Sequence, residues 1–146
     1  MSDVDVRPSG TTEPTSVVLV EDHRGIREMV AETLAAAGFR VLDTAGTVRD
    51  ARQSIVRHLP RVAVIDNRLP DGLGVDLCRT LSRETPSVAL LIYTTDLTPA
   101  RTREALDAGV DAVVLKSIHA QPLIDALRGL VAVRGPLAPG HGPVRR

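Results

Sequence analysis

Charged and hydroxyl side chains follow four short apolar runs in this sequence, each at the point where the run ends. In chain order they are Glu21 and Asp22 after VVLV, Asp66 after VAVI, Thr94 and Thr95 after VALLIY, and Lys116 after AVVL. In an open parallel sheet, ligands bind outside the carboxyl ends of the strands. If these runs are neighbouring parallel strands, three carboxylates, hydroxyls and one amine meet at one edge of the sheet.

Such a group of carboxylates predicts a site for a divalent cation. Carboxylates held close together raise one another's proton affinity unless a cation lies among them. Mg²⁺ suits this donor set, because it is bound through one or two carboxylates, keeps several waters and accepts phosphate oxygens. Zinc is disfavoured, since Cys78 is the only cysteine and no Cys or His cluster has ligand spacing.

The same residues could perform phosphoryl transfer. A carboxylate can act as a nucleophile and form an acyl phosphate, whose charge nearby cations then neutralise. Asp66 is best placed for this role, because it directly follows a strand-like run and precedes the turn RLPDGLG. Lys116 would supply a mobile positive charge, and the Thr94 hydroxyl could donate a hydrogen bond to a phosphoryl oxygen.

The elements that must position these side chains alternate regularly along the chain. Apolar runs typical of buried strands lie at 17–20, 40–43, 62–65, 88–93 and 112–115. Apolar residues at helical spacing lie at 23–37, 48–59, 75–84, 98–108 and 121–133. Repeated strand–helix units predict an α/β fold, a doubly wound five-stranded parallel sheet with helices on both faces.

Composition limits the setting of this domain. The 146 residues suffice for one domain, and 18 basic residues balance 18 acidic ones, so no strong field favours nucleic acid or an anionic membrane. No apolar run is long enough to span a bilayer, and a single cysteine fits a reducing compartment, so a cytoplasmic protein is expected. We expect residues 1–16 to form a disordered extension, 17–133 the domain, and 134–146 a flexible Pro/Gly-rich tail.

The motifs resemble those of a known family. The acidic pair in VEDH, the segment IDNRLPDGLG, the threonine in IYTT and the lysine in VVLK resemble, in order and separation, the receiver (CheY-like) domain of two-component response regulators. The resemblance covers about 17–131 and is greatest to NarL/FixJ-type receivers. It implies a flavodoxin-like sheet with strand order 2-1-3-4-5.

The resemblance also implies residue roles. Asp66 would be the aspartate phosphorylated by a sensor histidine kinase, with Thr94 as the switch hydroxyl and Lys116 as the phosphate-binding amine. Glu21 and Asp22 would hold Mg²⁺ together with Asp66 and the backbone carbonyl of Arg68. The sequence departs from the family at Val113, where an aromatic residue that turns inward on activation is usual.

Flanking residues have simpler or secondary interpretations. Arg68 and Asp96 lie two residues beyond Asp66 and Thr94, and we hypothesise that they set the lifetime of the phosphorylated state. They could equally be two solvated loop charges. His23 is expected to open the first helix exposed to solvent, and Asp71 with Gly72 to form a turn after Pro70.

These observations predict a signalling module that modifies only itself, not a metabolic enzyme. We expect a stand-alone receiver whose phosphorylation changes its surface for an unknown downstream protein or a phosphorelay, with no direct nucleic-acid binding by this chain. A phosphorylation-dependent dimer is one expected assembly. The alternative is a truncated or degenerate DNA-binding transcription regulator without its helix-turn-helix domain. An aspartate-nucleophile phosphatase would need a DxD motif after the first strand, which VEDH does not supply.

Overall fold

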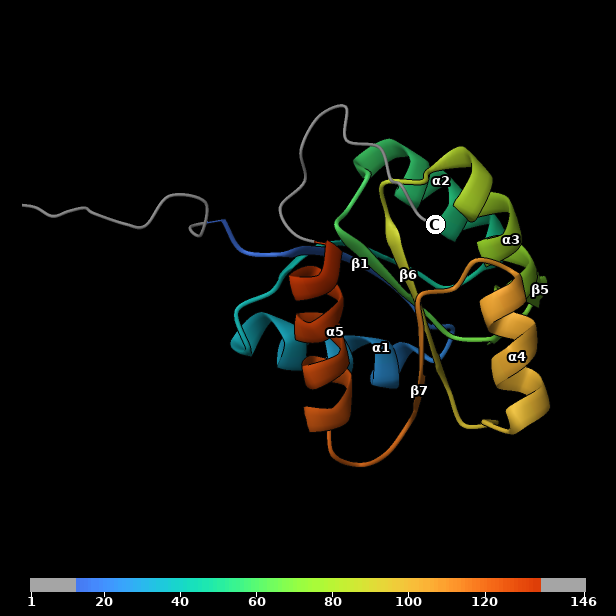
Figure 1. The fold of residues 1–146 in the computed structure, drawn as a ribbon. Coiled ribbons are helices and arrows are strands. Elements are labelled where there is room, and N and C mark those ends of the chain that lie inside the picture. Colours follow the sequence, from blue (N-terminus) through green and yellow to red (C-terminus); the bar gives the residue numbers. More distant parts are fainter. Residues whose placement is uncertain (1–12, 135–146) are drawn as a thin grey trace, which may run out of the picture.

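Strands and helices alternate along residues 13–134, the part of the chain that the computed structural model describes (Figure 1). Residues 1–12 and 135–146, which include most of the predicted extension and tail, lie outside the described residues. The strands are β1 Ser16–Val20, β2 Arg40–Ala45, β3 Val62–Ile65, β4 Arg68–Leu69, β5 Gly72–Leu73, β6 Ala89–Thr94 and β7 Ala112–Leu115. The helices are α1 Arg24–Ala36, α2 Val48–His58, α3 Gly74–Glu84, α4 Pro99–Asp107 and α5 Gln121–Arg134.

Five of these strands form one parallel sheet in the order β2-β1-β3-β6-β7. Counted among the sheet strands alone, this is the predicted order 2-1-3-4-5, so the predicted fold class is confirmed. β3 is the central strand, and its Val62 pairs with Val17 on one side and with Ala89 on the other. Asp66 therefore directly follows the central strand, which has two strands on each side.

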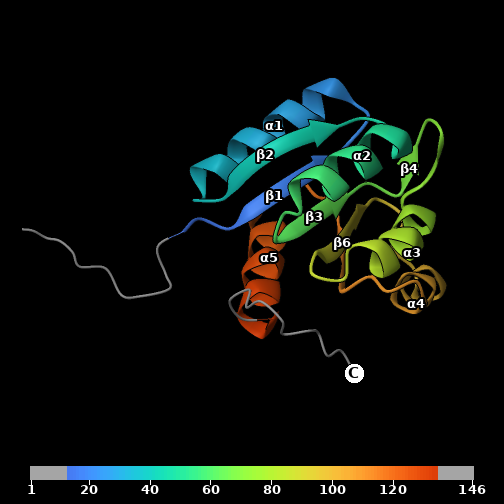
Figure 2. The same cartoon turned by 90° about the horizontal axis from the view of Figure 1, so that it is seen from above.

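Alternation of side chains along the strands divides the core into two layers, one on each face of the sheet. The first layer joins side chains of β1, β3 and β6, such as Val18 and Ile65, to α2, α3 and α4, and the second joins Leu19 and Val64 to α1 and α5. Figure 1 views the sheet nearly edge-on, with α1 and α5 on its left and the other three helices on its right. Figure 2 shows the same two layers from above.

Local sequence signals explain where the helices begin and end. His23, Thr47 and Thr98 precede α1, α2 and α4, and each side chain accepts a hydrogen bond from a backbone N–H in the first turn. Such caps satisfy donors that the helix itself leaves unpaired. Gly38 follows α1 with φ of 96°, a left-handed conformation that glycine adopts without steric cost.

The structure extends two predicted elements and adds one. β2 reaches Ala45, two residues past the expected end, and β6 includes Thr94, so this threonine ends a strand instead of following it. The segment expected to be a simple turn after Pro70 is a small antiparallel hairpin, in which β4 pairs with β5. Alternation alone could not predict strands of two residues.

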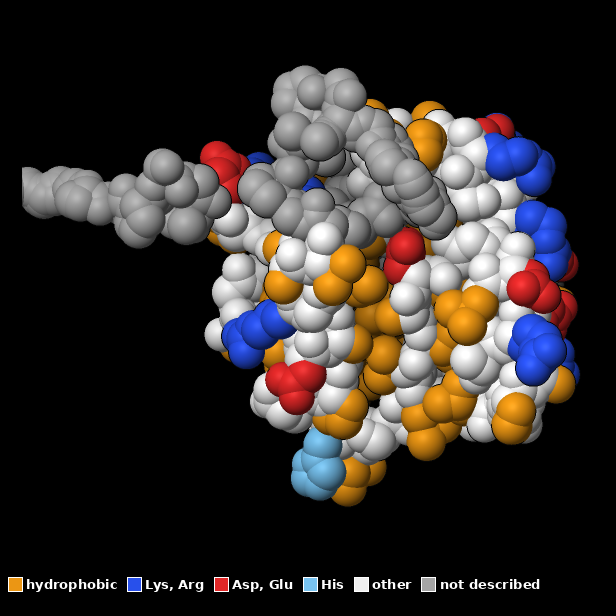
Figure 3. Space-filling model, viewed as in Figure 1, with side chains coloured by type: hydrophobic (Ala, Val, Ile, Leu, Met, Phe, Trp, Pro, Cys, Tyr) orange, Lys and Arg blue, Asp and Glu red, His pale blue; other side chains and the backbone are white. Residues whose placement is uncertain are grey.

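Hydrophobic side chains remain exposed near the β7 edge of the sheet. Leu106 of α4 is 53% exposed, Leu115 of β7 is 48% exposed, and Ile118 in the following loop is 94% exposed. Figure 3 shows hydrophobic side chains gathered between α5 and α4 along β7. Among the described residues, no helix has the length and apolar character needed to cross a membrane.

Candidate functional site

The predicted site residues meet at the carboxyl edge of the sheet, and backbone hydrogen bonds hold three of them there. The N–H of Asp66 donates to the carbonyl of Val20 (3.0 Å), and the N–H of Lys116 donates to that of Thr94 (2.7 Å). The N–H of Glu21 likewise donates to the carbonyl of β2 residue Ala45 (2.9 Å). These bonds continue the pairing of the sheet one residue beyond the strands, so the side chains start from a rigid frame.

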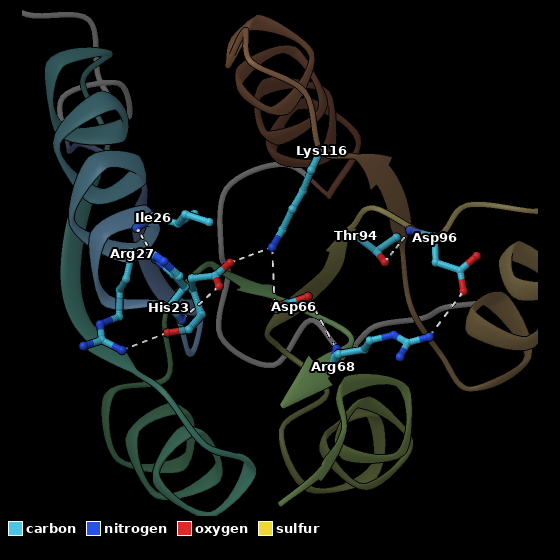
Figure 4. A network of polar contacts seen from close by, with 9 residues as sticks. His23, Ile26, Arg27, Asp66, Arg68, Thr94, Asp96 and Lys116 are labelled. Carbon is cyan, nitrogen blue, oxygen red and sulfur yellow. Dashed lines mark hydrogen bonds and ion pairs between the residues drawn. The ribbon is translucent and has the colours of Figure 1, made fainter. Parts of the chain in front are cut away.

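Lys116 links two of the carboxylates. Its Nζ lies 2.6 Å from Oε1 of Glu21 and 3.4 Å from Oδ2 of Asp66. The three side chains are 16%, 5% and 13% exposed, respectively, so water screens these charges less than it would at the open surface. Figure 4 shows Lys116 extending from the end of β7 towards Asp66.

The electrostatics of this group favour a cation. Burial raises the pKa of Asp66 above its ordinary value, and the negative charge of Glu21 raises it further, while Lys116 and the Arg68 N–H act in the opposite direction. Burial alone would lower the pKa of Lys116, but the hydrogen bond to Glu21 and the charge of Asp66 raise it. Lys116 is therefore a permanent cation at neutral pH, yet it does not fully offset the cost of a charged Asp66.

The donor set fits a divalent cation. Glu21, Asp22 and Asp66 each offer a carboxylate oxygen, and these oxygens lie within 4.8 Å of one another. Oxygen donors of this type and number suit Mg²⁺, which retains water in its remaining positions. The acidic loop is also held in place from α1, because Nη1 of Arg27 donates to the carbonyl of Glu21 (2.9 Å).

The opposite side of Asp66 carries the other predicted residues. The buried hydroxyl of Thr94 accepts a hydrogen bond from the N–H of Asp96 (3.0 Å), which leaves its own proton free to be donated. Arg68 lies on the far side of Asp66 from Lys116, and its guanidinium reaches towards Asp96, at 4.0 Å (Figure 4). Asp96 also pairs with Arg101 of α4 at 3.4 Å.

Some residues near the site were not expected from the sequence. Tyr93, the only tyrosine, is 6% exposed, and its ring centroid lies 5.8 Å from the Lys116 ammonium. Asp71 caps α2 instead of serving only its turn. Thr95, in contrast, is exposed, and His23 opens α1 exposed as predicted. The sequence could not predict that Tyr93 lies near Lys116, because an aromatic residue in an apolar strand is expected simply to be part of the core.

Comparison with known proteins identifies the family. The family model for the response regulator receiver domain matches residues 17–128, which is most of the chain. The chain belongs to the response regulator receiver family. This confirms the family expected from VEDH, IDNRLPDGLG and VVLK, and receivers are as a rule signalling modules and not metabolic enzymes.

Several relatives of this receiver are transcription regulators. It is 35% identical over 119 residues to the DNA-binding transcriptional activator DevR/DosR of Mycobacterium tuberculosis, with 81% of this chain and 55% of that protein covered. It is 28% identical over 123 residues to the phosphate regulon transcriptional regulatory protein PhoB of Pseudomonas aeruginosa, with 83% and 53% covered. The receiver thus spans about half the length of these relatives.

A solved structure of the same fold superimposes closely. The signal receiver domain of the putative response regulator NarL from Mycobacterium tuberculosis matches with a TM-score of 0.78 and 27% identity, covering 84% of this chain and 100% of that one. The likeness to a NarL receiver agrees with the sequence motifs.

Proposed function

We propose that this receiver accepts a phosphoryl group from a sensor histidine kinase onto Asp66, with Mg²⁺, and passes the signal on through protein contacts. The observation that carries the proposal is the position of Asp66. Its carboxylate is partly buried and lies 3.4 Å from the Lys116 ammonium. One of its oxygens also lies close enough to oxygens of Glu21 and Asp22 for the three to bind one cation.

The proposed transfer is a displacement at phosphorus. An Asp66 oxygen attacks the phosphorus of a phosphohistidine, the P–N bond breaks, and the leaving imidazole keeps the electron pair and takes up a proton. Lys116 neutralises a phosphoryl oxygen, and the Thr94 hydroxyl donates its free proton to another. Mg²⁺, held by Glu21, Asp22, Asp66 and the Arg68 carbonyl, would supply the remaining positive charge.

For this transfer to occur, the Lys116 ammonium must interact with the phosphoryl group as well as with Glu21. In the structure its ammonium is 0.8 Å closer to Glu21 than to Asp66 (2.6 against 3.4 Å). A phosphoryl group on Asp66 carries more negative charge than the carboxylate it replaces, so it competes for the amine. We propose that Lys116 then moves towards Asp66, and that this shift is one of the first changes felt outside the site.

We propose that Arg68 and Asp96 control how long the acyl phosphate lasts before hydrolysis. Their side chains are 75% and 38% exposed and face each other beside Asp66, where a hydrolytic water would approach. In the Arg68→Asn variant we expect the dephosphorylation rate to change several-fold, with Arg103→Asn on the outside of α4 as the control. An unchanged rate would remove Arg68 from this role.

The central experiment follows the mass of the intact chain after incubation with Mg²⁺ and acetyl phosphate. We expect a gain of one phosphoryl group, lost in Asp66→Asn and in excess EDTA, and retained in Asp107→Asn, which removes an exposed carboxylate on α4. A gain that persists in Asp66→Asn would place the reaction elsewhere. No gain in the wild-type chain, with a kinase or with acetyl phosphate, would refute the proposal.

Output through a downstream protein is supported by the exposed hydrophobic side chains of Leu106 and Leu115 between α4 and β7. Dimerisation on phosphorylation is one form such output could take. Light scattering of the chain with and without acetyl phosphate tests this form directly, since a dimer doubles the mass.

A second candidate is that this receiver is the regulatory portion of a DNA-binding transcription regulator. The observation in its favour is that the chain covers 55% of DevR/DosR, which is named as a DNA-binding transcriptional activator. A helix-turn-helix reading frame directly downstream in the gene would support it, and a natural stop codon after Arg146 would exclude it.

A further inference from the structure

The carboxylate of Asp71 bridges two segments that are far apart in the sequence. Its Oδ1 accepts a hydrogen bond from the N–H of Val48 (2.6 Å), and its Oδ2 accepts one from the N–H of Arg49 (3.1 Å). Val48 and Arg49 are the first two residues of α2, whereas Asp71 lies in the turn between β4 and β5. This contact joins the loop after the phosphoacceptor strand to a helix on the neighbouring unit of the fold.

The amides that Asp71 binds are those that the cap of α2 leaves unpaired. Thr47 Oγ1 accepts from the N–H of Asp50 (3.0 Å), and the Thr47 carbonyl accepts from the N–H of Ala51 (2.9 Å), the first bond of the helix ladder. The two amides before Asp50 have no partner within the helix. Asp71 fills both positions with one carboxylate, at the end of the helix where a negative charge is favourable. The two hydrogen bonds hold the pKa of Asp71 below its ordinary value, which agrees with an ionised cap.

The turn that carries Asp71 also lies close to α2. A Cβ on Gly72 would lie 3.4 Å from Cγ2 of Val48, so little more than a methyl group would fit between the turn and the first residue of the helix. The base of the same loop is closed by Asn67. Its carbonyl accepts from the N–H of Gly74 (2.7 Å), and its side-chain Oδ1 accepts from the N–H of Val75 (2.9 Å).

The other end of the hairpin touches the phosphoacceptor. The N–H of Arg68, in β4, donates to Oδ1 of Asp66 at 3.4 Å. The side chain of Arg68 is not a strong anchor, because it is 75% exposed and its ion pair with Asp96 is 4.0 Å long. The backbone of Arg68 is instead paired with Leu73 in the hairpin. Its position therefore depends on how the hairpin is held, at the base of the loop by Asn67 and at the tip by Asp71.

We propose that Asp71 is a positioning residue for the phosphorylation site. By capping α2 it holds the β4–β5 hairpin in place, and the hairpin holds the Arg68 backbone against the Asp66 carboxylate and beside the cation oxygens. Asp71 touches neither the phosphoryl group nor the cation and acts through Arg68. This assignment rests on the proposed function of Asp66.

The test compares Asp71→Ala with Thr47→Ala. Both variants remove a side-chain cap from the same end of α2, but only Asp71 ties that end to the hairpin. Three quantities are measured: the thermal midpoint of unfolding, the ¹⁵N order parameters of the amides at 68–73, and the dissociation constant of Mg²⁺ from amide shifts. Asp71→Asn keeps one acceptor oxygen without the charge and serves as an intermediate variant if Asp71→Ala fails to fold.

We expect both alanine variants to melt at similarly lowered temperatures. In Asp71→Ala alone, the hairpin order parameters fall from about 0.85, typical of rigid backbone, towards about 0.6, and Mg²⁺ binds at least about five-fold more weakly. Phosphoryl uptake at low Mg²⁺ slows with it and recovers in part at high Mg²⁺. Order parameters and Mg²⁺ affinity that are equal in the two variants would overturn the proposal.

The outcome for Asp71 can be separated from the outcome for Asp66. If the wild-type chain gains no phosphoryl mass, the proposed function fails, while the order parameters still show whether Asp71 holds the hairpin. If the wild-type chain is phosphorylated and Asp71→Ala binds Mg²⁺ equally well, only the role of Asp71 is refuted.

Discussion

Replacement of Gly74 by alanine should disturb the loop that follows β3 more than the small size of the added methyl group suggests. Gly74 is the first residue of α3, and it is buried directly beneath the loop that follows β3. A Cβ at this position would overlap the backbone carbonyl oxygen of Asp66 and would lie 2.9 Å from Cγ2 of Ile65 and 3.1 Å from Cα of Asn67. Two of these three neighbours are backbone atoms, which cannot rotate away.

The cost follows from that geometry. Contacts of ordinary length begin near 3.4 Å, so relief requires the loop and the helix to separate by several tenths of an ångström or more. Overpacking of this kind costs about 1–3 kcal/mol, and we expect the upper end because backbone must move. For a domain of this size that corresponds to a fall of about 10 °C in the melting temperature. Phosphoryl uptake should fall as well, since the displaced carbonyl belongs to Asp66, the proposed acceptor.

Gly129 provides the matched control. It lies exposed within α5, and a Cβ there would meet no atom within 4 Å. Gly129→Ala should therefore stabilise the chain by about 0.5–1 kcal/mol through helix propensity alone. Thermal unfolding followed by circular dichroism checks both variants. A Gly74→Ala melting temperature at or above that of the wild type would refute the steric argument.

Three further outcomes are expected. Burial raises the pKa of Tyr93 against the opposing charge of Lys116, so the phenol should titrate at higher pH in the folded chain than in urea. Folding stability should then fall as the pH rises above about 10, because the unfolded chain loses this proton first. The ultraviolet absorbance of this single tyrosine follows its ionisation in both states. Burial raises the pKa of the Cys78 thiol to about 12, so an aromatic disulfide reagent should label the chain only after unfolding, and rapid labelling of the native chain would contradict this. Leu81→Ala, at a fully buried position of α3, should cost about 2–5 kcal/mol in urea unfolding against less than about 1.5 for Leu81→Met, and equal losses would contradict the packing argument.

The sequence predicted those parts of the molecule that depend on repeated, local patterns. Apolar runs such as VVLV and VAVI can be recognised because a central parallel strand is buried on both faces, and the end of each run fixed the place of Glu21, Asp66 and Lys116 at the sheet edge. The convergence of these three residues followed from the parallel topology, in which all strands end on one side.

Other features depend on contacts between distant segments, and no local pattern could predict them. Asp71 bonds to amides 22 and 23 residues away, although its sequence context, a Pro-Asp-Gly turn, already explains its residue type. Lys116 divides its contacts unequally between Glu21 and Asp66, a detail that depends on side-chain geometry. The family motif gave both carboxylates a role, but it did not say which one the amine prefers.

The position of Asp66 directly after the central strand has a mechanical consequence. The four residues of β3 are at most 1% exposed, and strands pair with both of its edges, so Asp66 directly follows a fully enclosed segment. The side chains around it on the open side, Arg68 and Asp96, are 75% and 38% exposed. A charge added to Asp66 is therefore expected to displace these exposed side chains before it displaces the buried strand. Contacts lead outward from there through the hairpin and Asp71 to α2, and through Asp96 and Arg101 to α4, so these two helices are where we expect the displacement to be felt.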